Sequence, residues 1–258
     1  MRHVCLLCAL LLLAIRVSAA PDQSSQDSQN TIDEVTQALE SKMRHFLYRH
    51  GVPGAAVGVA VDGRIVYEQG YGWADVDQEV PVTPQSRFRI ASITKPFTAV
   101  AIMQLVEQGK LSLDDNPFDV IGMADLIRSP EVDPRLRDIT IEHCLKHTAG
   151  FGHREHGPDP MFQEDHLMKT LELDSRPNNM DLVRYVISQK LVQPPGSSYD
   201  YSNAGYTILG LVMEHITGTP YDSVIKQQIA APLDINDIGL GGAHVADRLA
   251  GEVMYYDP

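Results

Sequence analysis

The sequence predicts an α+β fold, on three observations. Two β-prone runs, 55–61 and 64–71, are separated by Asp62-Gly63, a dipeptide that favours the two-residue turn of a β-hairpin. Stretches in which apolar residues recur at helical spacing follow this hairpin over most of the remaining chain. Strands and helices do not alternate and no repeat is found, so parallel βαβ units are not expected.

Residues 1–20 have the pattern of a secretory signal peptide. Arg2 gives a basic start, residues 4–15 are an apolar run too short to span a membrane, and Ser18-Ala19-Ala20 forms a small-residue cleavage site. We therefore expect a secreted or periplasmic protein. Cleavage would leave 258 − 20 = 238 residues, and the formal charge would change from −13 to −15 because Arg2 and Arg16 are lost.

The composition indicates a chain held together by a hydrophobic core rather than by disulfides. After cleavage Cys144 would be the sole cysteine, and its apolar helical surroundings predict a buried, unreactive thiol. The acidic balance argues against nucleic acid and against anionic membrane surfaces as partners. No later apolar run is long enough to cross a membrane. The oligomeric state stays open.

We expect one domain over residues 31–258, after a flexible polar lead-in at 21–30. Thr31 begins a capping-box pattern, and the helix that follows should end at Gly51. Residues 151–180 show no clear period and are expected to be a long surface excursion. Further helices are expected from Ser92 to Gly109, after Thr140, and at 181–190, 204–216 and 220–229.

The most informative motif is a serine and a lysine three residues apart, Ser92 and Lys95, at the start of a helix that is apolar on nearly every face. Positions i and i+3 share one helix face, so the two side chains can meet. A lysine in an apolar setting loses its charge more easily and can then activate a serine nucleophile. The spacing alone is weak, because Ser223 and Lys226 have it too. We interpret that second pair as a chance match with surface residues.

Tyr201 and Asn203 lie at the entrance of a later apolar helix. Two positions apart at a helix entrance, both can point into a cleft, where the phenol can carry a proton and the amide can hold a substrate carbonyl or the lysine. The alternative is that Asn203 only caps the helix and Tyr201 only packs.

Taken together, the motifs Ser92-x-x-Lys95 and Tyr201-x-Asn203 resemble those of the serine β-lactamase and penicillin-binding superfamily, in its class C and esterase-like branch. The resemblance extends over about residues 35–240, and the matching flanks are 70–75, 88–92, 139–150, 195–196 and 201–206. It implies a β-lactamase/transpeptidase-like fold with a helical region and an antiparallel sheet flanked by the first and last helices.

The resemblance also implies a chemistry that needs no metal or organic cofactor. Ser92 would attack a carbonyl and form an acyl-enzyme, Lys95 and Tyr201 would share the proton traffic, and Asn203 would position the substrate. The substrate could be a β-lactam, a D-amino peptide or a short ester, and the sequence does not choose among them. A catalytically weak or inactive scaffold or binding homologue of the same fold is the first alternative.

The superfamily's third motif, Lys-Thr-Gly or His-x-Gly on a late strand, does not occur after Tyr201. That strand would supply one of two backbone donors for the oxyanion, and losing one such donor typically slows an enzyme by about a hundred- to a thousandfold. We therefore expect the chain to be a C-terminally incomplete piece of a longer protein, with an unpaired sheet edge that favours aggregation.

A zinc-dependent hydrolase is the second alternative. His143 and His147 are four residues apart and could share one metal, and His153, His156 and His166 follow. Against this, the chain has no glutamate-flanked pair of the HExxH kind.

Among the acidic residues near these histidines, Glu155, Glu164 and the neighbouring aspartates are expected to form a solvated face rather than to act in catalysis.

Overall fold

The computed structural model describes residues 23–152, 159–242 and 245–256, with side chains from Val35 onward. The chain forms two compact units, one up to Arg87 and again from Ala250, the other from Phe88 to Leu249. The expected signal peptide lies outside the described residues, so it stays a prediction. None of the described helices is both long and apolar enough to cross a membrane.

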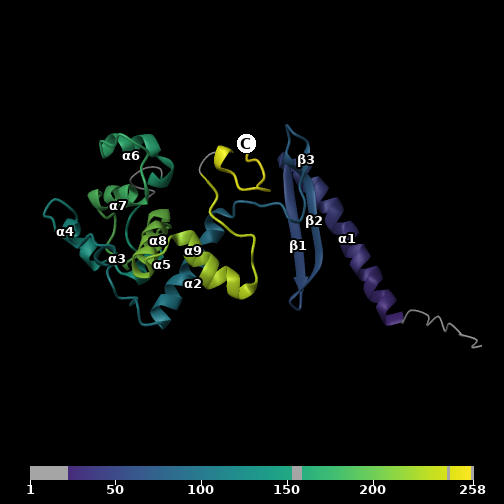
Figure 1. Cartoon of the computed structure of the whole chain (residues 1–258), viewed down its shortest axis with the longest axis horizontal. Coiled ribbons are helices and arrows are strands. Elements are labelled where there is room, and N and C mark those ends of the chain that lie inside the picture. The colour runs from purple at the N-terminus through teal and green to yellow at the C-terminus, as the bar shows by residue number, and fades with distance from the viewer. Residues whose placement is uncertain (1–22, 153–158, 243–244, 257–258) are drawn as a thin grey trace, which may run out of the picture. The chain divides into compact units, whose positions relative to one another are not determined.

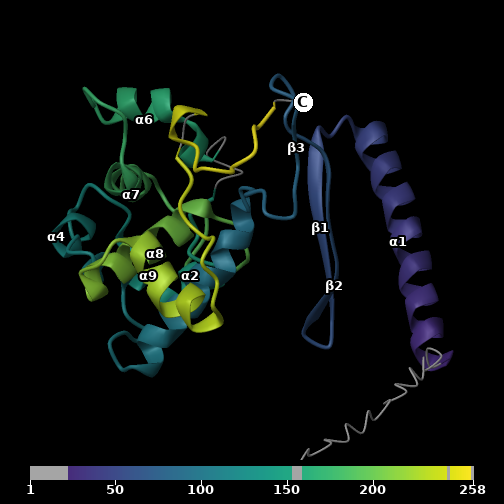
Figure 2. The same cartoon turned by 45° about the vertical axis from the view of Figure 1, so that its right-hand side comes forward.

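The first unit contains one long helix and a small antiparallel sheet in the order β1-β2-β3. Its elements are α1 (Gln23–His50), β1 (Gly54–Val61), β2 (Arg64–Asp75) and β3 (Val80–Pro81). The predicted hairpin is confirmed: Val61 pairs with Arg64, and the turn residues Asp62 and Gly63 have φ of +50° and +73°. Two positive φ values are what a type I′ turn requires. Helix α1 runs along the hairpin on the β2 side (Figures 1 and 2).

The helix of the first unit begins at Gln23, so the expectation of a flexible lead-in up to residue 30 was wrong for residues 23–30. Adding a turn to an existing helix is far easier than nucleating one, and serine and glutamine cost little in a helix. The capping pattern at Thr31 is therefore inside the helix.

The end of the described chain returns to the first unit. Met254 donates its backbone N–H to the Ala74 carbonyl at 2.7 Å, and Arg87 pairs with Glu252 in a single parallel bridge. A small cluster of buried residues, Ala74, Val82 and Val253, joins the sheet to this segment.

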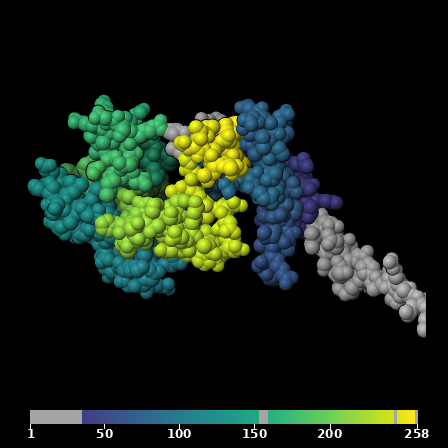
Figure 3. Space-filling view, viewed as in Figure 1, coloured from purple at the N-terminus to yellow at the C-terminus, as the bar shows by residue number. Residues whose placement is uncertain are grey.

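The second unit is helical. Its longer helices are α2 (Thr94–Glu107), α7 (Asn179–Ser188) and α8 (Asn203–Thr217). Its shorter ones are α3 (Pro117–Val120), α4 (Ala124–Ile127), α5 (Ile141–Leu145), α6 (Glu164–Thr170) and α9 (Tyr221–Ile225), which continues as a wider turn over Lys226–Ala230. Helices α2, α8 and α9 lie side by side in both cartoon views (Figures 1 and 2). In the space-filling view, α9 and the segment that follows it, in yellow-green, form part of the face of this unit that is turned to the viewer (Figure 3).

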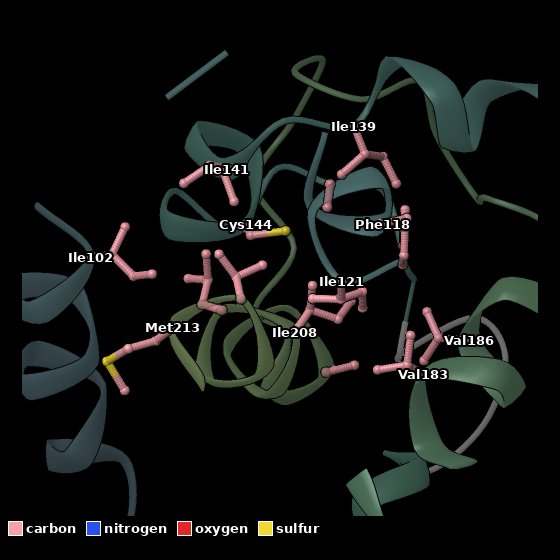
Figure 4. Packing of buried hydrophobic residues seen from close by; sticks show 14 of the residues in the cluster. Ile102, Phe118, Ile121, Ile139, Ile141, Cys144, Val183, Val186, Ile208 and Met213 are labelled. Atoms are coloured by element: carbon pink, nitrogen blue, oxygen red, sulfur yellow. The ribbon is translucent and has the colours of Figure 1, made fainter. Parts of the chain in front are cut away.

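Helix α8 is the centre of the main hydrophobic core, as Figure 4 shows. Ile208 and Met213 of α8 are fully buried among apolar side chains from α2, α3, α5 and α7. Cys144 of α5 is also buried there, and burial raises the pKa of its thiol to about 12. The prediction that Cys144 is buried is thus confirmed, and its low reactivity stays a prediction that the raised pKa supports.

Helix α2 is apolar on nearly every face, which is typical of a helix inside a core, but the structure does not bury all of its faces. Ala101, Ile102 and Leu105 are buried, whereas Val100 and Met103 keep 49% and 42% of their surface exposed. In this structure α2 packs with one face against α8 and α9. An all-apolar sequence does not by itself say which faces are covered.

The segment 151–180 contains more structure than its sequence suggested. A 3₁₀ turn spans Pro160–Phe162 and α6 spans Glu164–Thr170. Only Leu167 of α6 is buried, so a helix this short leaves no readable period. The expected cap at Thr140 is confirmed, with His143 rather than a glutamate completing the capping box.

Candidate active site

Ser92 lies in the 3₁₀ turn Ala91–Ile93, which leads directly into α2. Its side chain is exposed, as a nucleophile must be. The preceding residue, Ala91, has a φ of +43°, in the left-handed region that non-glycine residues rarely adopt. Strained backbone of this kind persists where its surroundings fix it, and it is concentrated at functional sites.

Four side chains predicted from the sequence converge at this turn. Lys95 Nζ donates to Ser92 Oγ at 3.2 Å, and the Tyr201 hydroxyl donates to the same oxygen at 2.6 Å. Lys95 Nζ also donates to Asn203 Oδ1 at 2.6 Å. The serine oxygen is thus within hydrogen-bond reach of two groups that can exchange protons. The predicted meeting of these residues is confirmed, and their chemical roles are taken up below.

The environment of Tyr201 favours ionisation of its phenol. Burial opposes the charged form, but hydrogen bonding with Lys95 and Ser92 and the positive charge of Lys95 outweigh it, and the pKa of Tyr201 lies below its ordinary value. Lys95 Nζ is also 4.6 Å from the centre of the Tyr201 ring and 5.6 Å from that of Tyr206. Two aromatic rings therefore line the space in which the lysine head group lies.

At the entrance of α8, one residue caps the helix and another contacts Lys95. Ser202, not Asn203, is the N-cap of α8, and its Oγ accepts a hydrogen bond from the Gly205 N–H at 3.1 Å. The alternative in which Asn203 only caps the helix is therefore wrong. As the first residue of the helix, Asn203 keeps its amide for the site.

His147 supports the tyrosine loop, whereas the sequence suggested it only as a possible zinc ligand. Its Nδ1 accepts a hydrogen bond from the Ser202 N–H at 3.1 Å, and its carbonyl accepts one from the Asp200 N–H at 2.7 Å. Its ring packs against those of Tyr201 and Tyr206, with centroids 4.6 and 5.0 Å apart. Its φ of +58° gives no signal in the sequence, where glycine would be the residue expected for that conformation.

Asp159 was missed as a site residue. Its Oδ2 accepts a hydrogen bond from Asn203 Nδ2 at 2.7 Å. The expectation that the aspartates of this region form only a solvated face is thus wrong for Asp159. No local pattern could reveal the contact, because the two residues are far apart in the chain and the segment between them has no readable period.

A cavity of about 470 Å³ opens beside Ser92 within the second unit. It follows one face of α8 from Asn203 to Glu214, and Ser92 and Lys95 also line it. Its other walls include Thr98, Met161, Phe162, Gly210, Tyr221 and Leu240. The cavity has the size and the mixed lining of a small-molecule site.

The histidines considered for zinc have other partners. His143 Nδ1 accepts the Thr140 N–H at 3.2 Å, and His166 Nε2 lies 3.3 Å from the Tyr185 hydroxyl. His153 and His156 lie outside the described residues. Within the ranges that the structure describes, no group of three or more His, Cys, Asp or Glu side chains is placed to hold a metal ion.

The second serine–lysine pair has none of this geometry. Lys226 Nζ forms a salt bridge with Asp222 at 2.6 Å and keeps 49% of its side chain exposed. The interpretation of this pair as a chance match is consistent with that contact.

Comparison with known proteins gives a single family. The model of the Beta-lactamase family matches residues 38–256. The esterase EstB of Burkholderia gladioli is 35% identical over 227 residues, which cover 85% of this chain and 54% of EstB. Protein flp of Staphylococcus aureus (strain N315) is 29% identical over 209 residues, which cover 81% of this chain and 38% of flp.

Among solved structures, the octameric penicillin-binding protein homologue from Pyrococcus abyssi aligns with a TM-score of 0.62 and 30% identity. The alignment covers 78% of this chain and 43% of that one. The chain thus spans about half of these relatives' length, or less. Because the family model spans most of the chain and the fold neighbours agree with it, the protein belongs to the β-lactamase family within the serine β-lactamase and penicillin-binding superfamily, and it has the α+β fold of that group.

Proposed function

We propose that the protein is a serine hydrolase that works through an acyl-serine intermediate. The observation that carries this proposal is the pair of hydrogen bonds to Ser92 Oγ, one from Lys95 and one from Tyr201. A serine hydroxyl needs an adjacent base to become a nucleophile, and both candidates for that base are already in contact with it.

In the proposed first step, Ser92 Oγ attacks the substrate carbonyl and its proton passes to the Tyr201 phenolate or to the neutral amine of Lys95. The lowered pKa of Tyr201 supports the phenolate as acceptor. The proton then goes to the leaving alcohol or amine as its bond to the carbonyl carbon breaks. In the second step, water gives a proton to the same base and attacks the acyl carbon. The bond between that carbon and Ser92 Oγ then breaks, the base returns the proton to Oγ, and the acid is released.

Esters are the substrate class that we propose first, because EstB is an esterase and is among the relatives that match most of this chain. β-Lactams and D-amino peptides pass through the same acyl-serine and stay as alternatives. The pattern of residues 1–20 supports a further proposal, that the protein acts outside the cytoplasm.

A fluorophosphonate probe with mass mapping tests the nucleophile. We expect labelling on Ser92 that is absent in Ser92→Ala and suppressed in Lys95→Ala. The chain offers a matched control, because Ser223→Ala and Lys226→Ala alter the same motif where the two side chains do not meet; labelling of Ser92 should persist in both. Folded protein without labelling on Ser92 would favour the inactive scaffold.

Substrate class is tested on the same variants with p-nitrophenyl esters, nitrocefin and D-Ala-D-Ala peptides. We expect the highest kcat/KM with a short ester, and loss of that activity in Ser92→Ala but not in Ser223→Ala. A higher kcat/KM with nitrocefin or with the peptide would replace the ester proposal and leave the acyl-serine proposal standing.

A further inference from the structure

The side-chain amide of Asn203 bridges a basic and an acidic side chain, Lys95 and Asp159. Its oxygen accepts from Lys95 Nζ at 2.6 Å, and its nitrogen donates to Asp159 Oδ2 at 2.7 Å. We propose that Asp159 is a positioning residue whose carboxylate fixes the Asn203 amide with its oxygen toward Lys95. The proposal rests on the proposed function, because it assigns the support of that same site.

The orientation follows from which groups can donate. An ionised carboxylate only accepts hydrogen bonds, and a lysine ammonium only donates them. Rotating the Asn203 amide by half a turn would place its NH₂ against Lys95 Nζ and its oxygen against the Asp159 carboxylate. Both hydrogen bonds would be lost and both new contacts would be repulsive. The arrangement therefore has one favourable state as long as Asp159 is charged.

The backbone holds Asp159 ready for this contact. Its Oδ1 accepts the Met161 N–H at 2.9 Å and caps the 3₁₀ turn Pro160–Phe162, whose first residue, Pro160, is buried. One carboxylate oxygen thus anchors the side chain to its own turn, and the other is directed at Asn203. A bond to an ionised acceptor is stronger than one between neutral groups.

The consequence for the site passes through Lys95. The lysine amine is held between Asn203 Oδ1 and Ser92 Oγ, at 2.6 and 3.2 Å. Without Asp159, the amide can present its NH₂ to the lysine and push the amine away from the serine. Asp159 acts on the lysine through Asn203, and its charge also acts directly on the Tyr201 phenol, whose pKa it raises.

Three single variants test the role. Asp159→Ala removes both bonds and should lower kcat/KM for ester hydrolysis, and the rate of Ser92 labelling, by roughly ten- to a hundredfold. Asp159→Asn keeps a residue that caps well but loses the charge, so the loss should be smaller, roughly three- to tenfold. The matched control is Asp165→Asn, which removes an equal charge from an exposed position on α6 and should leave both rates unchanged.

A paired exchange separates positioning from a general structural role. Asn203→Asp sets two carboxylates against each other and should lower kcat/KM strongly. In the double variant Asn203→Asp/Asp159→Asn, the new amide can donate to the new carboxylate, and kcat/KM should recover at least roughly tenfold over Asn203→Asp alone. No recovery, or an Asp159→Ala protein within about twofold of the wild type, would overturn the proposal.

The side-chain amide of Asn203 gives a readout that does not need activity. Its ¹H–¹⁵N signals are assigned by their absence in Asn203→Ala, and we expect their hydrogen exchange to be at least roughly tenfold faster in Asp159→Ala. If wild-type protein is neither active nor labelled at Ser92, the proposed function fails. The exchange measurement then still tests whether Asp159 fixes the Asn203 amide. Equal exchange rates in the wild type and in Asp159→Ala would refute the positioning role of Asp159.

Discussion

At the scale of single residues, two non-glycine backbones in the left-handed region border the site. Ala91, with φ of +43°, sets the turn that presents Ser92, and His147, with φ of +58°, holds the loop that presents Tyr201. A left-handed backbone costs a non-glycine residue about 1–3 kcal/mol of conformational free energy, and the surrounding structure holds each residue in it. The sequence shows the reactive side chains but not these two supports, because strain leaves no mark in the order of residues.

The lowered pKa of Tyr201 predicts the pH dependence of ester hydrolysis. A phenol with a lower pKa ionises at lower pH, so kcat/KM should rise with pH along a limb centred below the ordinary value of about 10. Lys95→Ala removes the hydrogen bond and the positive charge that lower the pKa of Tyr201, so the limb of the remaining activity should shift to higher pH. Tyr201→Phe should abolish the limb and lower kcat/KM about a hundredfold or more. An unchanged limb in Tyr201→Phe would assign the titration to another group.

Two substitutions of His147 test whether it holds the tyrosine loop. Asparagine tolerates a positive φ and offers an oxygen near the place of Nδ1, so His147→Asn should keep Ser92 labelling within about threefold of the wild type. His147→Ala loses the acceptor and the ring contacts, and labelling should slow by about tenfold. The control is His215→Asn, at an exposed position of α8. Equal labelling of all three variants would show that the Ser202 contact does not hold the loop.

At the scale of elements, the sequence predicted the turns and helix ends that depend on contacts between residues close together in the chain. The Asp62-Gly63 turn, the Thr140 cap and the end of α8 at Gly218, with φ of +63°, are set by residues within one turn of each other. The start of α1 and the existence of α6 were missed. Helix extension and short helices depend on weak preferences summed with packing, and those leave no strong local signal.

Asp133, whose side chain keeps 6% of its surface exposed, stabilises the turn Pro134–Asp138. Asp133 hydrogen-bonds Arg135, at 2.6 Å for the shortest contact, and accepts the Leu191 N–H at 3.0 Å. The hydrogen bonds of Arg135, helped by backbone N–H donors and opposed by burial, lower the pKa of Asp133 from 3.8 to about 2. Because the folded-state pKa is the lower one, the stabilisation is complete above about pH 4 and is lost as pH falls toward 2.

We expect Asp133→Asn to lower the free energy of unfolding by about 2 kcal/mol at pH 7. Its unfolding free energy should also fall less steeply than that of the wild type between about pH 4 and 2. Urea titrations at a series of pH values measure both. Asp119→Asn is the control, because the Asp119–Arg128 pair is half-exposed and should contribute about 1 kcal/mol or less. Parallel pH curves for wild type and Asp133→Asn would contradict the assignment.

At the scale of the whole molecule, the two units differ in how much core they hold. The unit from Phe88 to Leu249 contains the large cluster around α8, whereas the unit with α1 and the sheet has the small cluster of Ala74, Val82 and Val253. In the latter unit, Phe46 and Ile65 keep 47% and 69% of their surface exposed. Fewer buried contacts give a lower free energy of local opening.

Limited proteolysis should therefore cut the unit with α1 and the sheet first. We expect early cleavage in α1 or the hairpin, read by mass spectrometry, while α2 and α8 stay intact. Cys144 reports on the other unit, because its buried thiol should stay unreactive toward a thiol reagent until that unit unfolds. First cuts within α8, or Cys144 modified at the same rate as the first cleavage, would show that the two units open together.

By itself the sequence determined the family, the α+β class, the hairpin and the residues with reactive side chains. Ser92 and Lys95 share one turn, and Tyr201 and Asn203 share a helix entrance, so each pair follows from backbone geometry. Only the tertiary structure decided that the two pairs meet, that Asp159 holds the Asn203 amide and that His147 supports the tyrosine loop. Those contacts join segments far apart in the chain, and they are fixed by packing around α8 rather than by any pattern of neighbouring residues.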